Sequence, residues 1–491
     1  MQINKNIKKV VIVGGGISGL ATAYFIKIRA EQAGISLQMQ IIEKELQPGG
    51  KIRSIRDNGY LYEWGPNGFL DNKPQTLSLC SSLGIMDQLL VSNDNARKRF
   101  IYSNKKLHQL PHTPGKFLTS SLLSIGGRLR VLAEPFIDKL KDPKDESLAS
   151  FARRRLGQEA LDKLITPMAS GIFAANPETM SLKSCFPRIY ELEQQYGSLI
   201  KAFRQIGKAR KNEQENKDDN NKHPSPAGPG GKLTSFTNGL QTLIDALAAA
   251  IGADNIINEQ VTSIEKYGDG LYQIITHNGT YTADVVVSAA PSYVAAEIIG
   301  KAVDAQLGQL LSTIKYAPLV VVCSSYETKN IKHDLNGFGY LLASDETIPV
   351  LGSLWDSSIF ANRAPDGKIL FRTMLGGARY PNLVSLNDTE ISNIVRESFS
   401  KILGIKIDPD IEQVFRHEKA IPEYNLGHEK MLFEIEERLK FLPGIFLTGN
   451  AYHGVGINDC VLAADKTADK IMDYLQSYNS SYLNPGLCRI S

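Results

Sequence analysis

The stretch VVIVGGGISGL, residues 10–20, decides the fold of the first part of this chain. Its opening residues, Val10–Val13, predict a short buried strand, and the apolar spacing that follows predicts a helix over Ile17–Ala30. Gln38–Ile42 predicts a second strand, which completes a βαβ unit. Glycines at this turn permit a sharp bend, a close approach of backbone to a pyrophosphate, and close packing of helix on strand. The unit therefore predicts a dinucleotide site whose phosphate turn consists of Gly14, Gly15, Gly16, Ile17, Ser18 and Gly19.

Glu43 stands at the end of the second strand, where a carboxylate accepts hydrogen bonds from ribose hydroxyls and repels a 2′-phosphate. The residues after it bear on the choice between NAD and FAD. Gly49-Gly50-Lys51 forms a second glycine turn at a point where a plain NAD domain usually continues as helix. Such a turn can run along an extended cofactor, so the sequence favours FAD.

The C-terminal part of the chain supports the same cofactor. Ile445–Thr448 predicts a last strand, and Gly454–Asp459 opens a helix expected to reach Tyr474. The positive end of such a helix would stabilise the negative charge that a flavin acquires on reduction. A strand followed by a helix is expected over Leu233–Ile257, followed by Glu259–Ile264, and another strand is expected over Tyr281–Ser288. Parallel-sheet segments at the start, middle and end of the chain predict a discontinuous α/β domain.

Composition sets wider bounds. The 491 residues are 42% hydrophobic and 22% charged, which is ordinary for a globular protein of two or three domains. A net charge of +3 gives no indication of a nucleic-acid partner. The five cysteines show no metal-binding spacing and predict free thiols in a reducing compartment. We expect no signal peptide and no membrane-spanning segment, because no apolar run is long enough.

Residues 97–155 are strongly basic, with fourteen Lys/Arg against five Asp/Glu. An apolar stripe at helical spacing runs through this segment, interrupted in our prediction by Gly126, Gly127 and Pro135. Its members are Leu118, Leu122, Ile125, Leu129, Leu132, Phe136 and Leu140. The first interpretation is that the stripe packs on the protein's own core. The alternative is a basic, apolar surface that rests on anionic lipid or receives an anionic substrate.

Lys208–Lys232 has almost no apolar residues and is rich in charge, Asn, Pro and Gly. Such a segment cannot contribute to a core, and we interpret it as a flexible surface linker.

Several motifs resemble the family of oxygen-dependent, FAD-containing protoporphyrinogen oxidases, within the amine-oxidase-like flavoproteins. They cover most of the chain and include GGGISGLATAY, GGKIRS, EWGPNGF, SFARRRLG, GIFAANPETMSLKSCFP, GFGYLL and AYHGVGINDCVLAADK. The block GIFAAN…SCFP is the most specific, because general amine oxidases lack it. The resemblance implies a glutathione-reductase-type FAD domain (1–75, 233–300 and 436–478), a mixed-sheet substrate domain (76–95 and 301–435) and an inserted helical, membrane-associated domain (96–207).

The resemblance also implies site residues. Beyond the phosphate turn and Glu43, it places on FAD the residues Lys44, Lys51, Gly65, Pro66, Asn67, Gly68, Val261, Val455, Gly456 and Ile457. Around the substrate it places Arg99, Asn67, Ala174, Phe338, Leu341 and Met374. A flat apolar ring suits aliphatic and aromatic walls, and its carboxylates suit an arginine. Asn67 departs from animal-type members, which carry arginine there, so recognition of the propionate groups need not be identical.

The implied reaction is hydride transfer from a porphyrinogen to flavin N5, with molecular oxygen as the final acceptor and hydrogen peroxide as by-product. No residue is nominated as a catalytic base, and we interpret His453 as structural. No metal is expected. The resemblance also implies a cytoplasmic protein in peripheral contact with the membrane. It leaves open whether the chain forms a homodimer or hands its product to a chelatase.

Three other functions stay open at this point. A coproporphyrinogen III oxidase would act on a ring with more carboxylates and would need more cations in the pocket. An amine oxidase would need an aromatic cage at the flavin, for which Tyr452 alone is thin support, and a carotenoid desaturase shares the same scaffold. A carrier of lipidated partners on this fold need hold no flavin, whereas this chain keeps every FAD turn.

Overall fold

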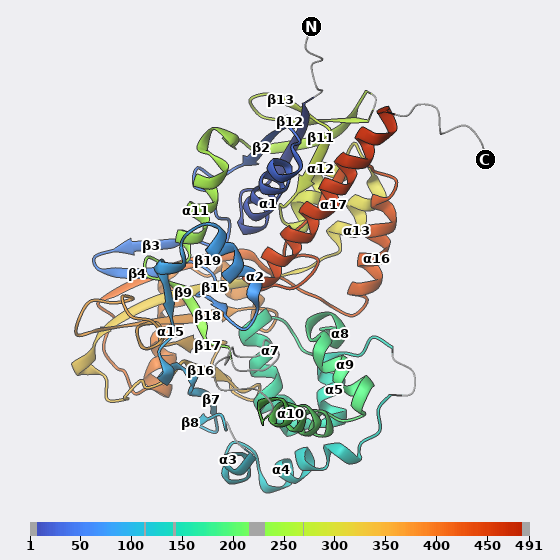
Figure 1. Ribbon diagram of the computed structural model, residues 1–491. Coiled ribbons are helices and arrows are strands. Elements are labelled where there is room, and N and C mark those ends of the chain that lie inside the picture. The colour runs from blue at the N-terminus through green and yellow to red at the C-terminus, as the bar shows by residue number, and fades with distance from the viewer. Residues whose placement is uncertain (1–6, 112–113, 141–143, 216–230, 269, 484–491) are drawn as a thin grey trace.

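The computed structural model describes residues 7–111, 114–140, 144–215, 231–268 and 270–483 (Figure 1). One end of the molecule is built on a five-stranded parallel sheet. In spatial order its strands are β10 (Ile256–Asn258), β2 (Leu37–Glu43), β1 (Lys8–Val13), β14 (Val285–Ser288) and β20 (Ile445–Leu447). Because these strands come from the start, middle and end of the sequence, the predicted discontinuous α/β arrangement is confirmed.

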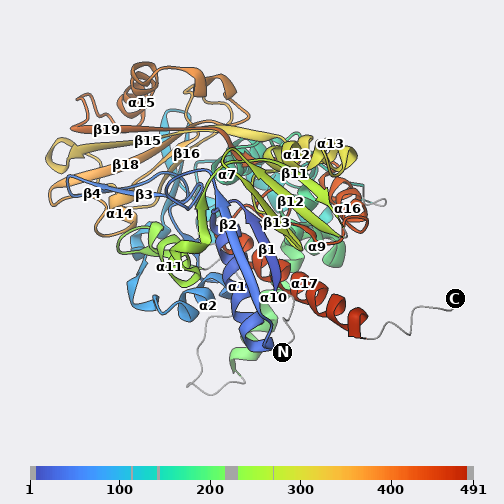
Figure 2. The ribbon, with the colours of Figure 1, turned by 90° about the horizontal axis from the view of Figure 1, so that it is seen from above.

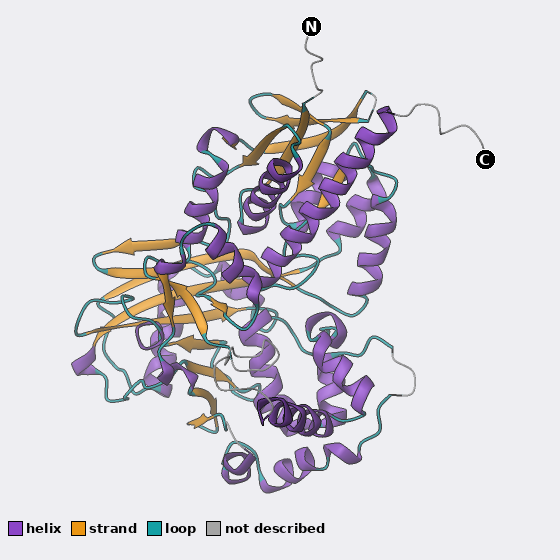
Figure 3. Cartoon of the chain, viewed as in Figure 1, coloured by secondary structure: helices purple, strands orange, loops and turns teal. Residues whose placement is uncertain are grey.

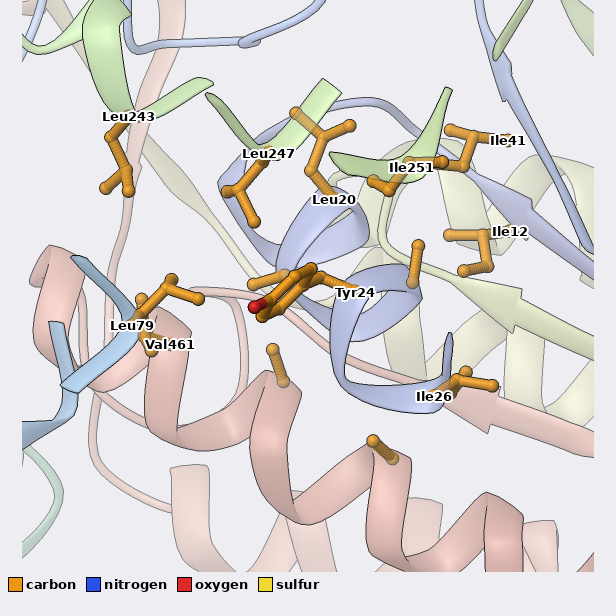
Figure 4. Close-up of a cluster of buried hydrophobic side chains, with 14 of the residues drawn as sticks. Ile12, Leu20, Tyr24, Ile26, Ile41, Leu79, Leu243, Leu247, Ile251 and Val461 are labelled. Atoms are coloured by element: carbon orange, nitrogen blue, oxygen red, sulfur yellow. The ribbon is translucent and has the colours of Figure 1, made fainter. Parts of the chain in front are cut away.

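Strand β1 is buried on both faces, as its unbroken apolar sequence requires. Val10 and Ile12 face a core closed by α1 (Ile17–Ala33), α11 (Gln241–Ile251) and α17 (Ile457–Leu483), with Tyr24 in its midst (Figure 4). Val11 and Val13 face a small antiparallel sheet of β11 (Val261–Tyr267), β12 (Leu271–Thr276) and β13 (Thr280–Ala283), together with α12 (Ser292–Gly300). With both faces covered, a ligand can approach this sheet only at the turns where its strands end.

A mixed seven-stranded sheet lies beside this domain (Figure 2). Its order is β19 (Ile411–Pro422), β15 (Tyr316–Glu327), β18 (Lys368–Gly376), β17 (Gly352–Leu354), β16 (Gly339–Leu342), β7 (Arg99–Ser103) and β8 (Lys106–Gln109). One face packs against α15 (Asp388–Ile402) through Phe399. The other face contacts the hairpin of β3 (Ser54–Asp57) and β4 (Tyr60–Glu63) through Tyr60 and Tyr62. This hairpin delivers the EWGPNGF turn to the sheet.

Helices fill the end of the molecule opposite β11–β13 (Figures 1 and 3). They are α3 (Pro114–Thr119), α4 (Ile125–Leu132), α5 (Leu148–Arg155), α7 (Thr166–Phe173), α8 (Leu182–Cys185), α9 (Pro187–Tyr196) and α10 (Leu199–Glu215). The fully buried guanidinium of Arg155 donates to Glu134 and Glu193. Glu134 in turn accepts the N–H groups of Leu199 and Ile200 at the start of α10. This ion-pair network joins α5, α9 and α10.

The predicted apolar stripe faces mainly outward. Leu122 is buried, whereas five other members are exposed, with Ile125 71% and Phe136 86% exposed; the remaining three are Leu118, Leu129 and Leu132. The interpretation that the stripe packs on the core is therefore wrong for these five, which we call the α3–α4 surface. Gly126 and Gly127 do not interrupt a helix, because both lie in the first turn of α4, where Ser124 accepts the Gly127 N–H.

The single strand predicted over Tyr281–Ser288 is wrong. The chain divides at Asp284 into β13 and β14, which belong to different sheets. Asp284 accepts hydrogen bonds from the Lys9 N–H and the Lys8 ammonium, and these contacts fix the bend against the start of β1. An unbroken apolar pattern cannot reveal such a change of sheet.

The linker predicted over residues 208–232 is wrong in its first part. Helix α10 continues through Glu215, while residues 216–230 lie outside the described part of the chain. The segment KARKNEQE lacks Gly and Pro and consists largely of strong helix formers, so it extends the helix although it brings no apolar face.

No described helix combines the length with the apolar character that crossing a bilayer demands.

Candidate functional site

The first glycine turn joins β1 to α1 at the edge of the parallel sheet. Gly14 has a φ of 105°, and its N–H donates to the Ile42 carbonyl at 2.9 Å. A Cβ at Gly19 would lie 1.9 Å from the Gly14 carbonyl oxygen, so α1 packs on the turn at a distance that only glycine allows. Gly16 caps α1 without a side-chain hydrogen bond, which leaves the first N–H groups of the helix for an anion.

The second glycine turn lies against the first. The Gly49 N–H donates to the Gly15 carbonyl at 2.9 Å, and Gly49 pairs with Gly16 in a parallel bridge. Gly49 and Gly50 have φ values of 131° and 59°, which side chains disfavour. A Cβ at Gly16 would meet only the Gly49 carbonyl oxygen, at 3.9 Å. The open space beside Gly16 fits the pyrophosphate of a dinucleotide.

Glu43 is buried at the end of β2, with its carboxylate turned toward the first glycine turn. Its oxygens accept the N–H groups of Gly15 at 2.6 Å and Glu45 at 2.9 Å. A carboxylate offers about four lone-pair positions, so capacity remains for ribose hydroxyls. Val261 begins β11 close by, since the Glu259 N–H donates to the Glu43 carbonyl. The side chain of Lys44 lies exposed at the surface beside Glu45, away from the Glu43 carboxylate.

Lys51 points from the second glycine turn into the protein interior. Its ammonium donates to the Ala420 carbonyl and lies 5.2 Å from the centre of the Tyr316 ring. Burial lowers the pKa of Lys51 to about 8. Ile421, which follows Ala420 on β19, packs in one apolar cluster with Ala174 and Met374. Through the Ala420 carbonyl, Lys51 thus connects the second glycine turn to the strand that packs against these two predicted substrate residues.

The EWGPNGF turn follows β4 and precedes β5 (Phe69–Leu70). The indole N–H of Trp64 donates to His417 Nδ1 at 3.0 Å, and His417 Nε2 lies 3.1 Å from the Trp64 carbonyl. This geometry requires a neutral imidazole with its proton on Nε2, and burial lowers the pKa of His417 in agreement.

Close backbone packing holds the rest of this turn. A Cβ at Gly65 would lie 2.3 Å from the Lys51 carbonyl oxygen, and one at Gly68 would lie 2.6 Å from that of Thr234. Pro66 and Asn67 lie between these two glycines. Asn67 is buried, and its amide is directed at Asp356. The turn is therefore rigid on both flanks of Asn67.

The entry of the last helix lies near the substrate residues. Val455 packs in the apolar cluster of Phe173, the residue before Ala174. Gly456 directly precedes α17, which begins at Ile457. The Tyr424 hydroxyl donates to the Asn450 carbonyl at 2.6 Å, and His428 Nε2 lies 3.2 Å from the Tyr452 carbonyl. These contacts fix the turn ahead of α17. His453 remains exposed in that turn.

Five of the predicted substrate residues lie on or directly beside β7, β16, β18 and α7. The Arg99 guanidinium lies 5.0 Å from the centre of the Phe338 ring and pairs with no described carboxylate. Ala174, at the end of α7, packs with Met374 of β18. Leu341 belongs to a neighbouring cluster, and a Cβ at Gly171 of α7 would lie 2.8 Å from its side chain. Asn67 is the member contributed by the EWGPNGF turn.

Sequence reasoning missed four residues that shape this site: His417, Asp356, Arg372 and Tyr424. Two of them did carry a signal, since Asp356 and Arg372 are the single charges within the stretches SLWDSSIF and ILFRTML. The histidine and the tyrosine carried none, because their contacts join distant parts of the chain. In the described part of the chain, no group of three or more His, Cys, Asp or Glu is placed to hold a metal ion.

Comparison with known proteins agrees with this geometry. Residues 17–472 match the family described as Flavin containing amine oxidoreductase. A chloroplastic protoporphyrinogen oxidase of Oryza sativa is 33% identical over 95% of this chain and 89% of its own length. A coproporphyrinogen III oxidase of Bacillus subtilis is 29% identical over 96% of this chain and 99% of its own.

A crystal structure from Exiguobacterium sp. 255-15, named provisionally as a protoporphyrinogen oxidase, is 25% identical with a TM-score of 0.79. It covers 96% of this chain and 99% of its own. The matched residues include the end of the first glycine turn from Ile17 on, the whole second glycine turn and the entry of α17. The chain is an FAD-dependent oxidoreductase of the flavin containing amine oxidoreductase family, and within it belongs to the protoporphyrinogen and coproporphyrinogen III oxidases.

Proposed function

We propose that the protein oxidises protoporphyrinogen IX to protoporphyrin IX, with molecular oxygen as acceptor. The observation that supports this most lies at β19, where Lys51 of the FAD turn donates to the Ala420 carbonyl and the adjacent Ile421 packs in the apolar cluster of Ala174 and Met374. Bound FAD supplies the two-electron acceptor for such a reaction. An apolar wall next to the flavin motifs suits a flat hydrophobic ring better than a small polar amine.

The protein's own residues bind and orient in this proposal. The glycine turns hold the pyrophosphate, Glu43 the ribose, Val261 the adenine side, and Val455, Gly456 and Ile457 the flavin. Arg99, Phe338, Leu341, Met374 and Ala174 surround the macrocycle, with Asn67 at the flavin side. Lys44 contacts FAD through its backbone only in this proposal, because its side chain lies at the surface. The division into FAD, substrate and helical domains is part of the same proposal.

The choice of protoporphyrinogen over coproporphyrinogen rests on charge. Arg99 is the single cation among the proposed substrate residues, and no described carboxylate neutralises it. A porphyrinogen with fewer carboxylates leaves fewer charges unpaired in an apolar pocket, where an unpaired charge is costly. Coproporphyrinogen III is the second candidate, because a relative matched over nearly its whole length carries that name.

Arg99→Ala is expected to raise KM for protoporphyrinogen IX about tenfold to a hundredfold with little change in kcat, because an ionic hydrogen bond to a propionate is lost. Arg99→Lys should keep part of the affinity. Steady-state porphyrin fluorescence measures both constants. Lys106→Ala, an exposed cation on the adjacent strand β8, is the matched control and should behave as wild type. An unchanged KM in Arg99→Ala would contradict the placement of the propionate.

FAD binding is expected to weaken as pH rises above about 8. The pKa of Lys51 is about 8 in the free protein. In this proposal the FAD phosphates lie along the glycine turn that carries Lys51 and favour the charged amine, so the bound form keeps a proton that the free form loses. Affinity is then constant below that pH and falls by up to about tenfold per unit above it. Quenching of FAD fluorescence by apoprotein, from about pH 6.5 to 9.5, measures this.

Matched lysine variants isolate the effect. Lys51→Met should bind FAD weakly with no such pH dependence, whereas Lys51→Arg should bind tightly throughout the range. Lys44→Met removes an exposed lysine nearby and should keep the wild-type slope. The same slope in Lys51→Met as in wild type would contradict this assignment.

We also propose that the protein is cytoplasmic and lies peripherally on the membrane through the α3–α4 surface. Its five exposed apolar residues belong to the most basic segment of the chain, and Lys116 and Arg128 lie within the same helices. An amphipathic surface of this kind gains both from apolar burial at the headgroup boundary and from attraction to anionic lipid.

A further inference from the structure

A buried cluster of charges lies directly behind the EWGPNGF turn. It contains two carboxylates and two guanidiniums, all nearly inaccessible to solvent: Glu63, Asp356, Arg363 and Arg372. Glu63 is 3.4 Å from Arg363, and Asp356 is 3.4 Å from Arg372. In the first pair, Glu63 also accepts hydrogen bonds from the Ser54 hydroxyl and the Leu240 N–H. The second pair contacts the turn itself.

Asp356 and Arg372 each hold one residue of the turn. The Arg372 guanidinium donates to the Gly65 carbonyl, and Asp356 Oδ1 accepts from Asn67 Nδ2 at 3.0 Å. Arg372 also lies two residues from Met374 on β18, so both side chains lie on the same face of this strand. Arg372 contacts the turn, and Met374 belongs to the proposed substrate wall. The pair therefore connects Asn67 with the proposed pocket.

These contacts determine which way the Asn67 amide faces. The Asn67 amide presents its nitrogen to Asp356 Oδ1, while Asp356 Oδ2 lies 3.4 Å from the Arg372 guanidinium, so Asp356 is the acceptor in both contacts. Its oxygen then turns away from Asp356. Asn67 is buried, and Oδ1 has no hydrogen-bond partner among the described residues. A buried acceptor without a partner calls for an explanation.

We propose that Asp356 and Arg372 are positioning residues that hold Asn67 Oδ1 as an acceptor for the pyrrole N–H groups of the substrate. This inference rests on the proposed function. A porphyrinogen carries N–H donors at its centre, and oxidation to the porphyrin removes part of them. An acceptor fixed there binds the reduced ring better than the product. Stability is a weaker explanation, because a buried ion pair contributes little more than well-packed apolar side chains would.

The test compares Asp356→Asn with wild type. The new amide can present either its oxygen or its nitrogen, so Asn67 is free to turn over. The melting temperature should fall, because Arg372 loses its buried partner. The FAD content of the folded protein should stay near wild type, while kcat/KM for protoporphyrinogen IX falls about tenfold or more, since misplacement of one contact has effects of this size. Asp304→Asn is the matched control, because it removes another Asp–Arg ion pair remote from the site and should leave kcat/KM unchanged.

A double-mutant cycle separates positioning from general damage. If Asp356 acts through Asn67, Asn67→Ala and Asn67→Ala/Asp356→Asn have the same kcat/KM. Should Asp356→Asn fold poorly, Asp356→Asn/Arg372→Gln removes both charges together and should show the same loss in the folded protein. The inference is overturned if Asp356→Asn lowers kcat/KM by the same factor in wild type and in Asn67→Ala, or if it lowers the melting temperature and leaves kcat/KM unchanged. Either result leaves the proposed function standing. A wild-type protein that oxidises no porphyrinogen overturns the proposed function and the inference with it.

Discussion

Gly19→Ala is expected to yield protein that holds no FAD and has no oxidase activity. The added methyl group would lie 1.9 Å from the Gly14 carbonyl oxygen, which is backbone and cannot turn aside as a flexible side chain could. Relief requires α1 to move away from the turn, and that movement takes the helix N-terminus away from the pyrophosphate. The absorbance spectrum of the purified variant, with and without added FAD, measures the loss.

Gly126→Ala is the matched control. Gly126 also lies in the first turn of a helix, yet its Cβ would meet only the Ser124 hydroxyl oxygen at 3.9 Å. This variant should retain FAD and activity, and its helix should be stabilised by up to about 1 kcal/mol. A Gly19→Ala protein with a full flavin spectrum would contradict the close packing at the first glycine turn.

Charges introduced into the α3–α4 surface are expected to abolish binding to anionic vesicles. The triple variant Ile125→Asp, Leu129→Asp and Phe136→Asp removes three exposed apolar side chains and adds three negative charges. Each apolar side chain contributes about 1.5–3 kcal/mol when fully buried, so together they should change partitioning by about a hundredfold or more. Sedimentation with phosphatidylserine-containing vesicles measures it, and porphyrinogen oxidation in detergent should persist.

Phe433→Asp/Phe441→Asp provides the comparison for that variant. Both phenylalanines are exposed but belong to α16 (His428–Leu439) and the turn after it, outside the basic segment. This double variant should sediment with vesicles as wild type does. Equal sedimentation of the triple variant and wild type would contradict the membrane role of the α3–α4 surface.

The parts of the site that the sequence predicts are those governed by local geometry. The first glycine turn and the entry of α17 are recognisable because turn, helix start and strand end lie within a few residues of one another. Contacts between distant residues are not recognisable in this way. His417 and Trp64 are 353 positions apart, and Asn67 and Asp356 are 289 apart, so no spacing rule connects them.

Burial of a periodic stripe is equally hard to predict. The spacing of Ile125, Leu129 and Leu132 correctly indicates a helix with one apolar face. It cannot indicate whether that face meets the core or the solvent, because the answer depends on helices distant in sequence, among them α5, α9 and α10, which the Arg155 network joins. The bend at Asp284 has the same origin, since it depends on a contact with the first strand.

Oxidation of protoporphyrinogen IX is tested with the purified wild-type protein under air, whose absorbance spectrum is recorded before protoporphyrinogen IX and coproporphyrinogen III are supplied separately. We expect a flavin spectrum and rapid porphyrin fluorescence from protoporphyrinogen IX, with a lower kcat/KM for coproporphyrinogen III. Faster oxidation of coproporphyrinogen III would reverse the assignment of substrate. A flavin spectrum without porphyrin formation above the rate in the absence of enzyme would contradict the proposed function.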